Sequence, residues 1–310
     1  MWDGGLDRSW YNDSHEYFIY TAEQFAYFVE LAKSGYDFKN KTITLMSSID
    51  FNSNELEPIE TFAGTFNGNG NAIFNLRISG STRGGLISNN TGTIMKLEII
   101  NITVTAVSSS AWGDAYCYAG GLAGYNYGTI NECSVSGQVS ADASAHADSG
   151  YCAAYAYAGG IAGYNEGVIS NTYAKVKVYA TTYDRSYSSN FFSFGFAGGL
   201  VGYNTGTVSY CYTAGATVRT SGDGSSTGGG LIGRHQAGKI YSCCTTVSGS
   251  ASGSYYSFSG GIVGTSAGIV ENCYDNRDEK MQTVLLYTET LGWNSEIWCF
   301  IEGTYPALKK

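Results

Sequence analysis

One glycine-rich phrase recurs along the chain and limits its possible folds more than any other feature. In its clearest copy it reads Gly-Gly-Leu-Ala-Gly-Tyr-Asn. Full or weakened copies begin at Gly84, Gly120, Gly159, Gly198, Gly229 and Gly260. Successive copies lie 36, 39, 39, 31 and 31 residues apart. A phrase that returns at this period, with length changes confined to the stretches between copies, predicts a solenoid of stacked repeats.

The residues of the phrase favour strands over helices, because paired glycines and an Asn-x-Gly turn are poor helix formers. Each copy begins with a short apolar strand and then turns at an Asn that stands two residues before a Gly. A second strand follows, as at 129–136, and a third is centred on a valine such as Val139. Three strands per repeat, stacked in register, predict an all-β parallel β-helix whose rungs bury their inward side chains only against each other.

The ends of the chain are expected to cap this stack. Residues 22–33 predict a helix, because Thr21 is a good N-cap, Gln24 completes a capping box and apolar residues such as Phe25 and Phe28 share one face. Such a helix would cover the open end of the first rung. We therefore expect one domain over 1–310, with an N-terminal cap at 1–60, rungs at 61–276 and a C-terminal cap at 277–310.

Charge and hydropathy exclude several classes of partner. The chain holds 17 Lys and Arg against 26 Asp and Glu, a net charge of −9, so we expect no nucleic-acid partner and no binding to anionic membranes. No stretch approaches the roughly 20 apolar residues of a spanning helix, so membrane insertion is not expected. The first residues lack the basic and apolar regions of a signal peptide, so the chain either is intracellular or has lost a leader.

The cysteines follow the repeat. Four of the eight share one repeat position, which Leu97 and Thr172 occupy in the other copies. They are Cys133, Cys211, Cys243 and Cys273. No Cys-x-x-Cys pair suggests a metal site, so we predict an inward ladder of reduced thiols. Rungs about 4.8 Å apart would also permit a disulfide between Cys211 and Cys243.

A second ladder and a set of long excursions complete the repeat. Stacked amides of Asn90, Asn126, Asn165 and Asn204 are expected to hydrogen-bond from rung to rung. The chain makes long excursions at 104–118, 139–157 and 176–196, which predict protruding β-hairpin arms.

Aromatic residues in these arms alternate with small ones. Tyr116 and Tyr155 belong to this row, with Cys117 and Ala156 on the intervening side. One interpretation buries the row as a satellite core beneath paired arm strands. The other makes the arms a binding surface, because tyrosine forms adaptable contacts at low entropic cost. The candidate binding residues are Tyr151, Tyr183, Tyr187, Tyr116 and Tyr155.

No catalytic set, metal site or cofactor site is indicated. Glycoside hydrolysis needs two convergent carboxylates, but the acidic residues occupy different repeat positions. They include Glu132, Glu166, Asp184, Asp223 and Glu271. The three histidines, His15, His146 and His235, are distant in sequence and are interpreted as solvated surface residues. A polysaccharide-degrading β-helix enzyme, a lyase or a glycosidase, stays an alternative, because carboxylates can converge in the fold.

The repeated phrase, with the upstream Phe66-Asn67-Gly68-Asn69-Gly70, resembles the GLUG-motif family over nearly the whole chain. The resemblance implies a right-handed β-helix of the kind found in large secreted or cell-surface bacterial proteins, some associated with IgA-protease-like metallopeptidases. It thus implies an extracellular or surface location and a longer parent chain. We predict a noncatalytic adhesion module whose Tyr-rich arms contact glycan or a partner protein, with a passive stalk as a further alternative.

Overall fold

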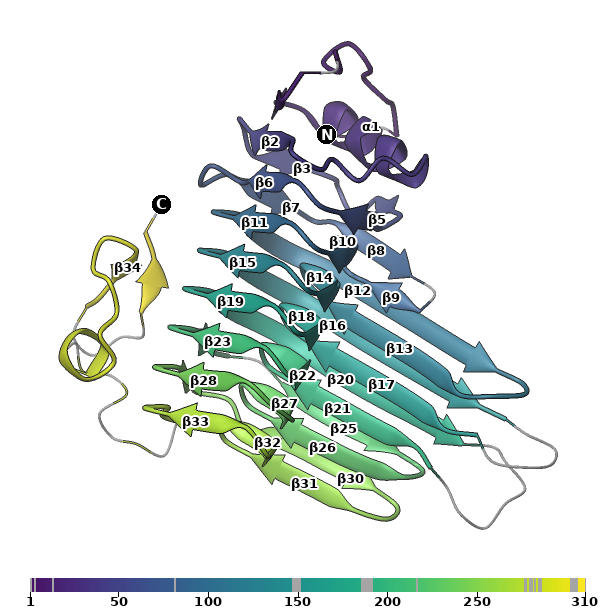
Figure 1. The fold of residues 1–310 in the computed structure, drawn as a ribbon, viewed down its shortest axis with the longest axis vertical. Helices are drawn as coiled ribbons and strands as arrows, with labels where there is room; N and C mark the ends of the chain where they lie inside the picture. Colours follow the sequence, from purple (N-terminus) through teal and green to yellow (C-terminus); the bar gives the residue numbers. More distant parts are fainter. Residues whose placement is uncertain are drawn as a thin grey trace.

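The structure is a computed structural model, and it describes every residue except 1, 3, 13, 81, 147–151, 185–191, 216, 276, 277, 279, 280, 282, 284, 285, 302–305 and 310. The described chain forms a parallel β-solenoid, as predicted (Figure 1). The strands of the solenoid lie in four sheets, A to D, and most rungs pass through them in the order A, B, D, C. The prediction of three strands per rung was wrong, because the arms contribute a fourth.

Sheets A and C form the narrow side of the stack. Sheet A contains β1 (Glu16–Ile19), β2 (Thr42–Leu45), β6 (Thr65–Asn67), β11 (Thr93–Met95), β15 (Thr129–Asn131), β19 (Val168–Ser170), β23 (Thr207–Ser209), β28 (Lys239–Tyr241) and β33 (Ile269–Glu271). Sheet C contains β5 (Ile59–Phe62), β10 (Ile87–Asn90), β14 (Ala123–Asn126), β18 (Ala162–Asn165), β22 (Val201–Asn204), β27 (Ile232–His235) and β32 (Val263–Ser266).

Sheets B and D form the broad side, from which the arms project. Sheet B contains β3 (Ile49–Asp50), β4 (Glu55–Leu56), β7 (Ala72–Phe74), β8 (Arg77–Gly80), β12 (Glu98–Ser110), β16 (Ser134–Ala145), β20 (Tyr173–Asp184), β24 (Tyr212–Thr213), β25 (Val218–Gly222), β29 (Cys244–Thr245) and β30 (Gly249–Gly253). Sheet D contains β9 (Arg83–Gly84), β13 (Ala115–Gly120), β17 (Ala154–Gly159), β21 (Phe194–Gly198), β26 (Ser225–Gly229) and β31 (Ser257–Gly260).

The arms are not hairpins, which corrects the sequence prediction. The outgoing strand of an arm, such as β16, pairs in parallel with β12 and β20 in sheet B. The returning strand, β17, pairs in parallel with β13 and β21 in sheet D. Because similar excursions recur at the same place in successive rungs, each strand bonds to its equivalent in the next rung. The two strands of one arm pack across an interior of small side chains such as Ala141 and Ala156.

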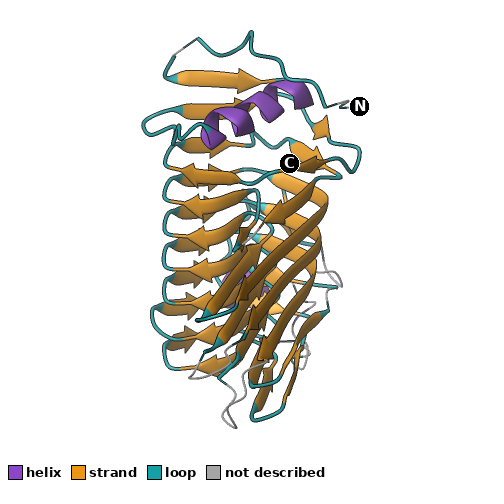
Figure 2. Ribbon diagram, turned by 90° about the vertical axis from the view of Figure 1, so that its right-hand side faces the viewer, coloured by secondary structure: helices purple, strands orange, loops and turns teal. Residues whose placement is uncertain are grey.

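The N-terminal helix α1 (Ala22–Lys33) covers the first rungs, as predicted (Figures 1 and 2). The side chain of Thr21 accepts a hydrogen bond from the Gln24 backbone at 3.3 Å. Phe25 and Phe28 are fully buried. The ring centroid of Phe28 lies 5.9 Å from that of Phe66 in the stack. The helix therefore closes the end of the core with its aromatic face.

The C-terminal segment lies on the flank of the stack. It contains the π-helix η2 (Leu286–Thr290) and the antiparallel strands β34 (Trp298–Cys299) and β35 (Ala307–Leu308). Trp293 and Trp298 are buried in a second core with Tyr212 of sheet B. Strand β33 of the last rung stays open, with Ile269 54% exposed. The described part of 277–310 thus packs beside the rungs and leaves their end uncovered.

The two predicted inward ladders are confirmed. The Nδ2 groups of Asn90, Asn126 and Asn165 each donate to the Oδ1 of the next Asn at 2.7 Å, ending at Asn204. Cys133, Cys211 and Cys243 are fully buried and Cys273 is half-buried, and all eight cysteines are free. Burial raises the pKa of Cys133 to about 12, which keeps its thiol protonated.

His235 is buried, contrary to the prediction of a solvated histidine. It occupies the ladder position after Asn204, whose Nδ2 lies 3.1 Å from His235 Nδ1. The other ring nitrogen, Nε2, lies 3.2 Å from the carbonyl oxygen of Ile269. The amide donates and the carbonyl accepts, so the neutral ring with its proton on Nε2 satisfies both contacts. His235 therefore extends the asparagine ladder by one rung.

Candidate functional site: an aromatic binding face

Nine aromatic side chains form three columns on the outer surface where sheets D and C meet. Strand alternation places Tyr116 and Tyr118 outward, whereas Cys117 and Ala119 are fully buried. Parallel in-register pairing then aligns equivalent residues of three rungs. The outer column is Tyr116, Tyr155 and Phe194, the middle column is Tyr118, Tyr157 and Phe196, and the inner column is Tyr125, Tyr164 and Tyr203. We call these nine residues the aromatic face.

The rings within each column lie nearly parallel and in contact. Ring centroids are 4.7 and 5.3 Å apart in the outer column, 4.8 and 5.3 Å in the middle column, and 4.4 and 4.8 Å in the inner column. These distances match the spacing of about 4.8 Å between neighbouring strands. The backbone register therefore sets the stacking, and the face is as rigid as the sheet beneath it.

The middle and inner columns meet edge to face. Tyr157 and Tyr203 have centroids 5.6 Å apart and ring planes at 85°. Phe196 and Tyr203 repeat the arrangement at 5.5 Å and 82°. The third glycine of the repeated phrase permits this contact, because a Cβ at Gly163 would lie 2.7 Å from the backbone nitrogen of Ala119. That glycine thus lets a sheet C strand pass directly against sheet D.

An arginine covers each end of the aromatic face. Before the first aromatic rung, the Arg83 guanidinium lies 5.9 Å from the ring centroid of Tyr118 and 5.7 Å from that of Tyr125. After the last, Arg234 lies 5.9 Å from Phe196 and 6.0 Å from Tyr203. Arg83 donates to Asn89 Oδ1 at 2.7 Å, and Arg234 donates to Gln236 Oε1 at 2.7 and 3.0 Å. Cation–π contacts of this kind hold both guanidinium groups on the face.

The phenol groups of Tyr118, Tyr157 and Tyr164 stay protonated at neutral pH. Burial raises the pKa of Tyr118 to about 12 and also raises the pKa values of Tyr157 and Tyr164. The hydroxyl of Tyr125 donates to Glu166 Oε1 at 2.6 Å. The face therefore presents apolar rings, neutral hydroxyl groups and two cations on a chain whose net charge is −9.

The outer column is the part most open to a ligand. Tyr116 is 41% exposed, and Tyr155 and Phe194 are half-buried. In contrast, Tyr157 is 7% and Phe196 is 5% exposed. Tyr118, Tyr164 and Tyr203 are half-buried, so the middle and inner columns also reach the surface in part, and Tyr116 is the most exposed ring of the face. The interpretation of the row as a satellite core was wrong, because the small residues of sheet D, and not its aromatic ones, face sheet B.

The structure does not bring the predicted binding residues together on one surface. Tyr116 and Tyr155 lie next to each other in the outer column. Tyr183 lies on β20, on the opposite outer surface formed by sheet B, and is 48% exposed. Tyr151 and Tyr187 lie outside the described residues.

Sequence reasoning missed several members of the face. Aligning the Tyr of the repeated phrase between copies gives the inner column directly. The two arginines follow from the same alignment, because Arg83 pairs with Tyr118 and Arg234 pairs with Tyr203. Each arginine therefore occupies the repeat position of an aromatic residue, one rung beyond the end of the aromatic face.

No metal site accompanies the face. Within the described ranges, no group of three or more His, Cys, Asp or Glu side chains could hold a metal ion. Likewise, among the helices that the structure describes, none is long and apolar enough to cross a membrane.

These features define a parallel β-solenoid repeat protein with a surface ladder of stacked aromatic residues. Residues 115–140, which contain the first full copy of the phrase, match the GLUG motif, so the chain carries that motif. A search of curated proteins finds no match. Among solved structures, the chain is similar to one described as a putative immunoglobulin A1 protease from Bacteroides ovatus. The two share 20% identity with a TM-score of 0.61, over 96% of this chain and 93% of the other. At that identity the likeness shows the fold alone.

Proposed function

We propose that this chain is a noncatalytic binding module of a secreted or cell-surface bacterial protein, and that its aromatic face binds a partner protein. The observation that carries the proposal is the outer column of Tyr116, Tyr155 and Phe194, held on a rigid sheet beside middle and inner columns whose two ends each carry an arginine. Tyrosine and arginine are enriched among the residues that dominate protein–protein binding energy. Because the strands fix these side chains before binding, little conformational entropy is lost on association.

Ring spacing favours a protein over a glycan on this face. Neighbouring rings of the outer column are already in contact, with centroids 4.7 and 5.3 Å apart, so a sugar ring cannot enter between them. A protein surface needs no such gap, because it can pack across ring edges and hydrogen-bond to the phenol groups. A broad face three rungs deep also suits a partner larger than one sugar.

Three of the five acidic residues weighed as catalytic candidates have structural partners of their own, which supports a noncatalytic role for those three. Glu166 accepts the hydrogen bond from Tyr125. Glu271 forms an ion pair with Lys239 at 2.8 Å. The side chain of Asn131 donates to Glu132 at 2.8 Å. Asp184 and Asp223 are instead neighbours, because the Asp184 backbone nitrogen donates to Asp223 Oδ2 at 3.1 Å. A glycosidase needs two carboxyl groups directed at one bond, about 5 to 10 Å apart.

The GLUG motif supports an extracellular setting, and the name of the similar solved structure suggests a first partner to test. We would immobilise the chain and measure binding of immunoglobulin A1 within a panel of extracellular host proteins. The triple variant Tyr116→Ala, Tyr155→Ala, Phe194→Ala should bind the retained partner at least tenfold more weakly, because hot-spot truncations typically cost about 2 kcal/mol or more. Tyr183→Ala, which removes an equally exposed tyrosine from the other surface, should bind normally.

Three outcomes would contradict the proposal. The triple variant could keep full affinity, or Tyr183→Ala could lose as much as the triple. Binding to no protein of the panel would instead favour a passive stalk. Product analysis on a glycan array completes the test, because release of oligosaccharides would establish the polysaccharide-degrading alternative.

A further inference from the structure

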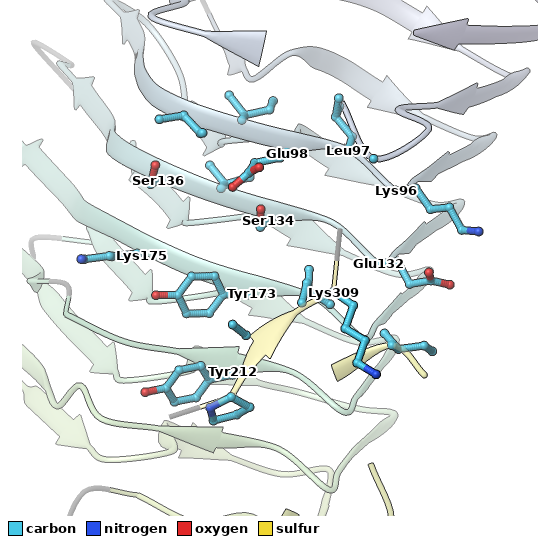
Figure 3. Close-up of a pocket in the computed structure, with 18 of the residues that line it drawn as sticks. Lys96, Leu97, Glu98, Glu132, Ser134, Ser136, Tyr173, Lys175, Tyr212 and Lys309 are labelled. Carbon is cyan, nitrogen blue, oxygen red and sulfur yellow. The ribbon is translucent and has the colours of Figure 1, made fainter. Parts of the chain in front are cut away.

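A pocket of about 1070 Å³ lies between the outer surface of sheet B and the C-terminal segment, away from the aromatic face (Figure 3). Glu98, Ser134, Tyr173 and Lys175 line its sheet side. Leu308 of β35 and Lys309, which follows that strand, line the opposite side. The volume is at the upper end of the range of small-molecule sites, which is about 300 to 1,000 Å³.

The sheet side of the pocket is one column of the register. Glu98 pairs with Ser134, Ser134 with Tyr173, and Tyr173 with Tyr212. The rings of Tyr173 and Tyr212 lie 5.4 Å apart, so this column begins as an aromatic stack. Ser134 then interrupts it with a small side chain. Two strand spacings, about 10 Å, separate the backbones of Glu98 and Tyr173, which leaves room for a ring over Ser134.

The opposite side of the pocket is anchored to the stack. Trp298 is fully buried in the core that it shares with Tyr212. The indole nitrogen of Trp293 donates to the carbonyl oxygen of Ser242 at 2.8 Å. The backbone nitrogen of Lys309 donates to the carbonyl oxygen of Ile297 at 2.8 Å. Both sides of the pocket are therefore built before a ligand arrives.

Among the described residues that line the pocket, positive and negative charges balance. Three lysines and three glutamates line it: Lys96, Lys175, Lys309, Glu98, Glu132 and Glu296. A site for an anion such as a phosphate or a carboxylate would carry an excess of cations. Here carboxylates, ammonium groups and the hydroxyls of Ser134 and Ser136 surround the stacked rings of Tyr173 and Tyr212. Carboxylates accept and ammonium groups donate hydrogen bonds, which suits a ligand with several hydroxyl groups.

We propose that this pocket binds a neutral sugar ring of a glycan chain. The apolar face of the sugar packs against Tyr173, as aromatic side chains with a polar rim allow. Its hydroxyl groups donate to Glu98, exchange hydrogen bonds with Ser134 and accept from Lys175. Figure 3 shows Glu98 and Ser134 together above Tyr173, so these groups converge on one space. This site is separate from the proposed protein-binding face.

The test uses the whole chain on an array of neutral and sialylated glycans, with calorimetry on each retained neutral oligosaccharide. Ser134→Leu fills the space beside Tyr173 without removing a core contact, and Glu98→Gln keeps the shape while removing the charge. Each should weaken neutral-glycan binding at least tenfold. Ser140→Leu is the matched control, because Ser140 lies on the same strand and the same half-buried surface but outside the pocket. It should bind normally.

Retention of no neutral glycan by the wild type would overturn the proposal. So would retention of sialylated glycans only, or unchanged affinity in both pocket variants. Thermal unfolding confirms that each variant is folded before binding is compared. The triple variant of the aromatic face should keep full glycan affinity. If it loses glycan binding while the pocket variants keep it, the glycan lies on the aromatic face and both site assignments fail.

Discussion

The asparagine ladder and the aromatic face arise from the same repeat but serve different ends. Both are columns of equivalent side chains aligned by parallel register. Asn126 and Asn165 are fully buried, so their amides have only one another and nearby backbone as partners. Tyr116 and Tyr155 stack just as regularly, yet they remain open to solvent. Register thus aligns side chains, and burial decides whether a column stabilises the fold or is available for binding. Changes in the inward column should therefore lower stability, and changes in the outer column should lower binding.

The largest effect is expected from Asn165→Ala. This change removes two buried hydrogen bonds and leaves an amide of Asn126 and an oxygen of Asn204 without their partner. Unfolding in denaturant should show a loss of about 2 to 4 kcal/mol, since each unsatisfied group costs about 1 to 3 kcal/mol. Asn89→Ala, which alters an outward Asn on β10, should cost less than Asn165→Ala, because the Arg83 and Glu60 groups that it leaves can turn to water. Equal losses in the two variants would contradict the distinction between the columns.

The second-largest loss of stability is expected from Gly163→Ala. The added Cβ meets backbone atoms of sheet D at 2.7 to 3.0 Å, and backbone cannot move aside as a flexible side chain can. We expect a loss of about 1 to 3 kcal/mol, as for other overpacked sites. Partner binding should also weaken, because the strand carries Tyr164 of the aromatic face. Gly113→Ala meets only Ser110 Oγ at 3.7 Å and should leave the melting temperature unchanged. An unchanged melting temperature in Gly163→Ala would show that sheets C and D do not meet this closely.

A smaller effect concerns pH and His235. Burial lowers the pKa of His235 below its ordinary value of 6.5. The unfolded chain then binds more protons at this site than the folded chain. The contribution of His235 to stability is therefore present above pH 6.5 and declines as the pH falls below it.

This dependence can be measured by comparing two proteins. His235→Asn restores the ladder residue and removes the titrating group. Denaturant unfolding between pH 7 and pH 5 should show a smaller decline in the variant than in the wild type. The same decline in both proteins would indicate that His235 is not the group responsible.

The cysteine ladder gives the smallest expected effect on stability and a clear chemical result. Cys299 is exposed, whereas Cys133, Cys211 and Cys243 are fully buried. A thiol reagent should modify Cys299 rapidly in the native state and reach the buried three only after denaturation. Counts in denaturant should be equal with and without reductant. A gain of thiols on reduction would reveal a disulfide.

The repeated phrase predicted much of the fold because its glycines and asparagines mark where the backbone turns and where strands pack closely. Gly163 and the ladder asparagines define a turn and a contact in every rung, so alignment of copies gave the stack and its inward columns. The pairing of the arm strands was harder to predict, because the alternation of aromatic and small residues does not show which strand each one pairs with. Only the equal placement of excursions in successive rungs makes rung-to-rung pairing possible.

The outward direction of the aromatic row was missed for a specific reason. Strict strand alternation, followed back from the buried Leu122, places Tyr118 and Tyr116 on the inward side. In the structure Ala119 and Leu122 are both fully buried, three residues apart. The Gly120-Gly121 bend between sheets D and C therefore breaks the alternation. His235 was missed because its polarity suggested solvent, whereas the ladder supplies both hydrogen-bond partners that its neutral ring needs.

The most direct test of the central claim compares two tyrosines of similar exposure on opposite surfaces. Tyr116 is 41% and Tyr183 is 48% exposed. Hydroxyl-radical footprinting, read by mass spectrometry, would measure the oxidation of each side chain with and without the bound partner protein. We predict that oxidation of Tyr116 falls on binding while that of Tyr183 stays constant. Protection of Tyr183 with no change at Tyr116 would contradict the assignment of the aromatic face as the binding surface.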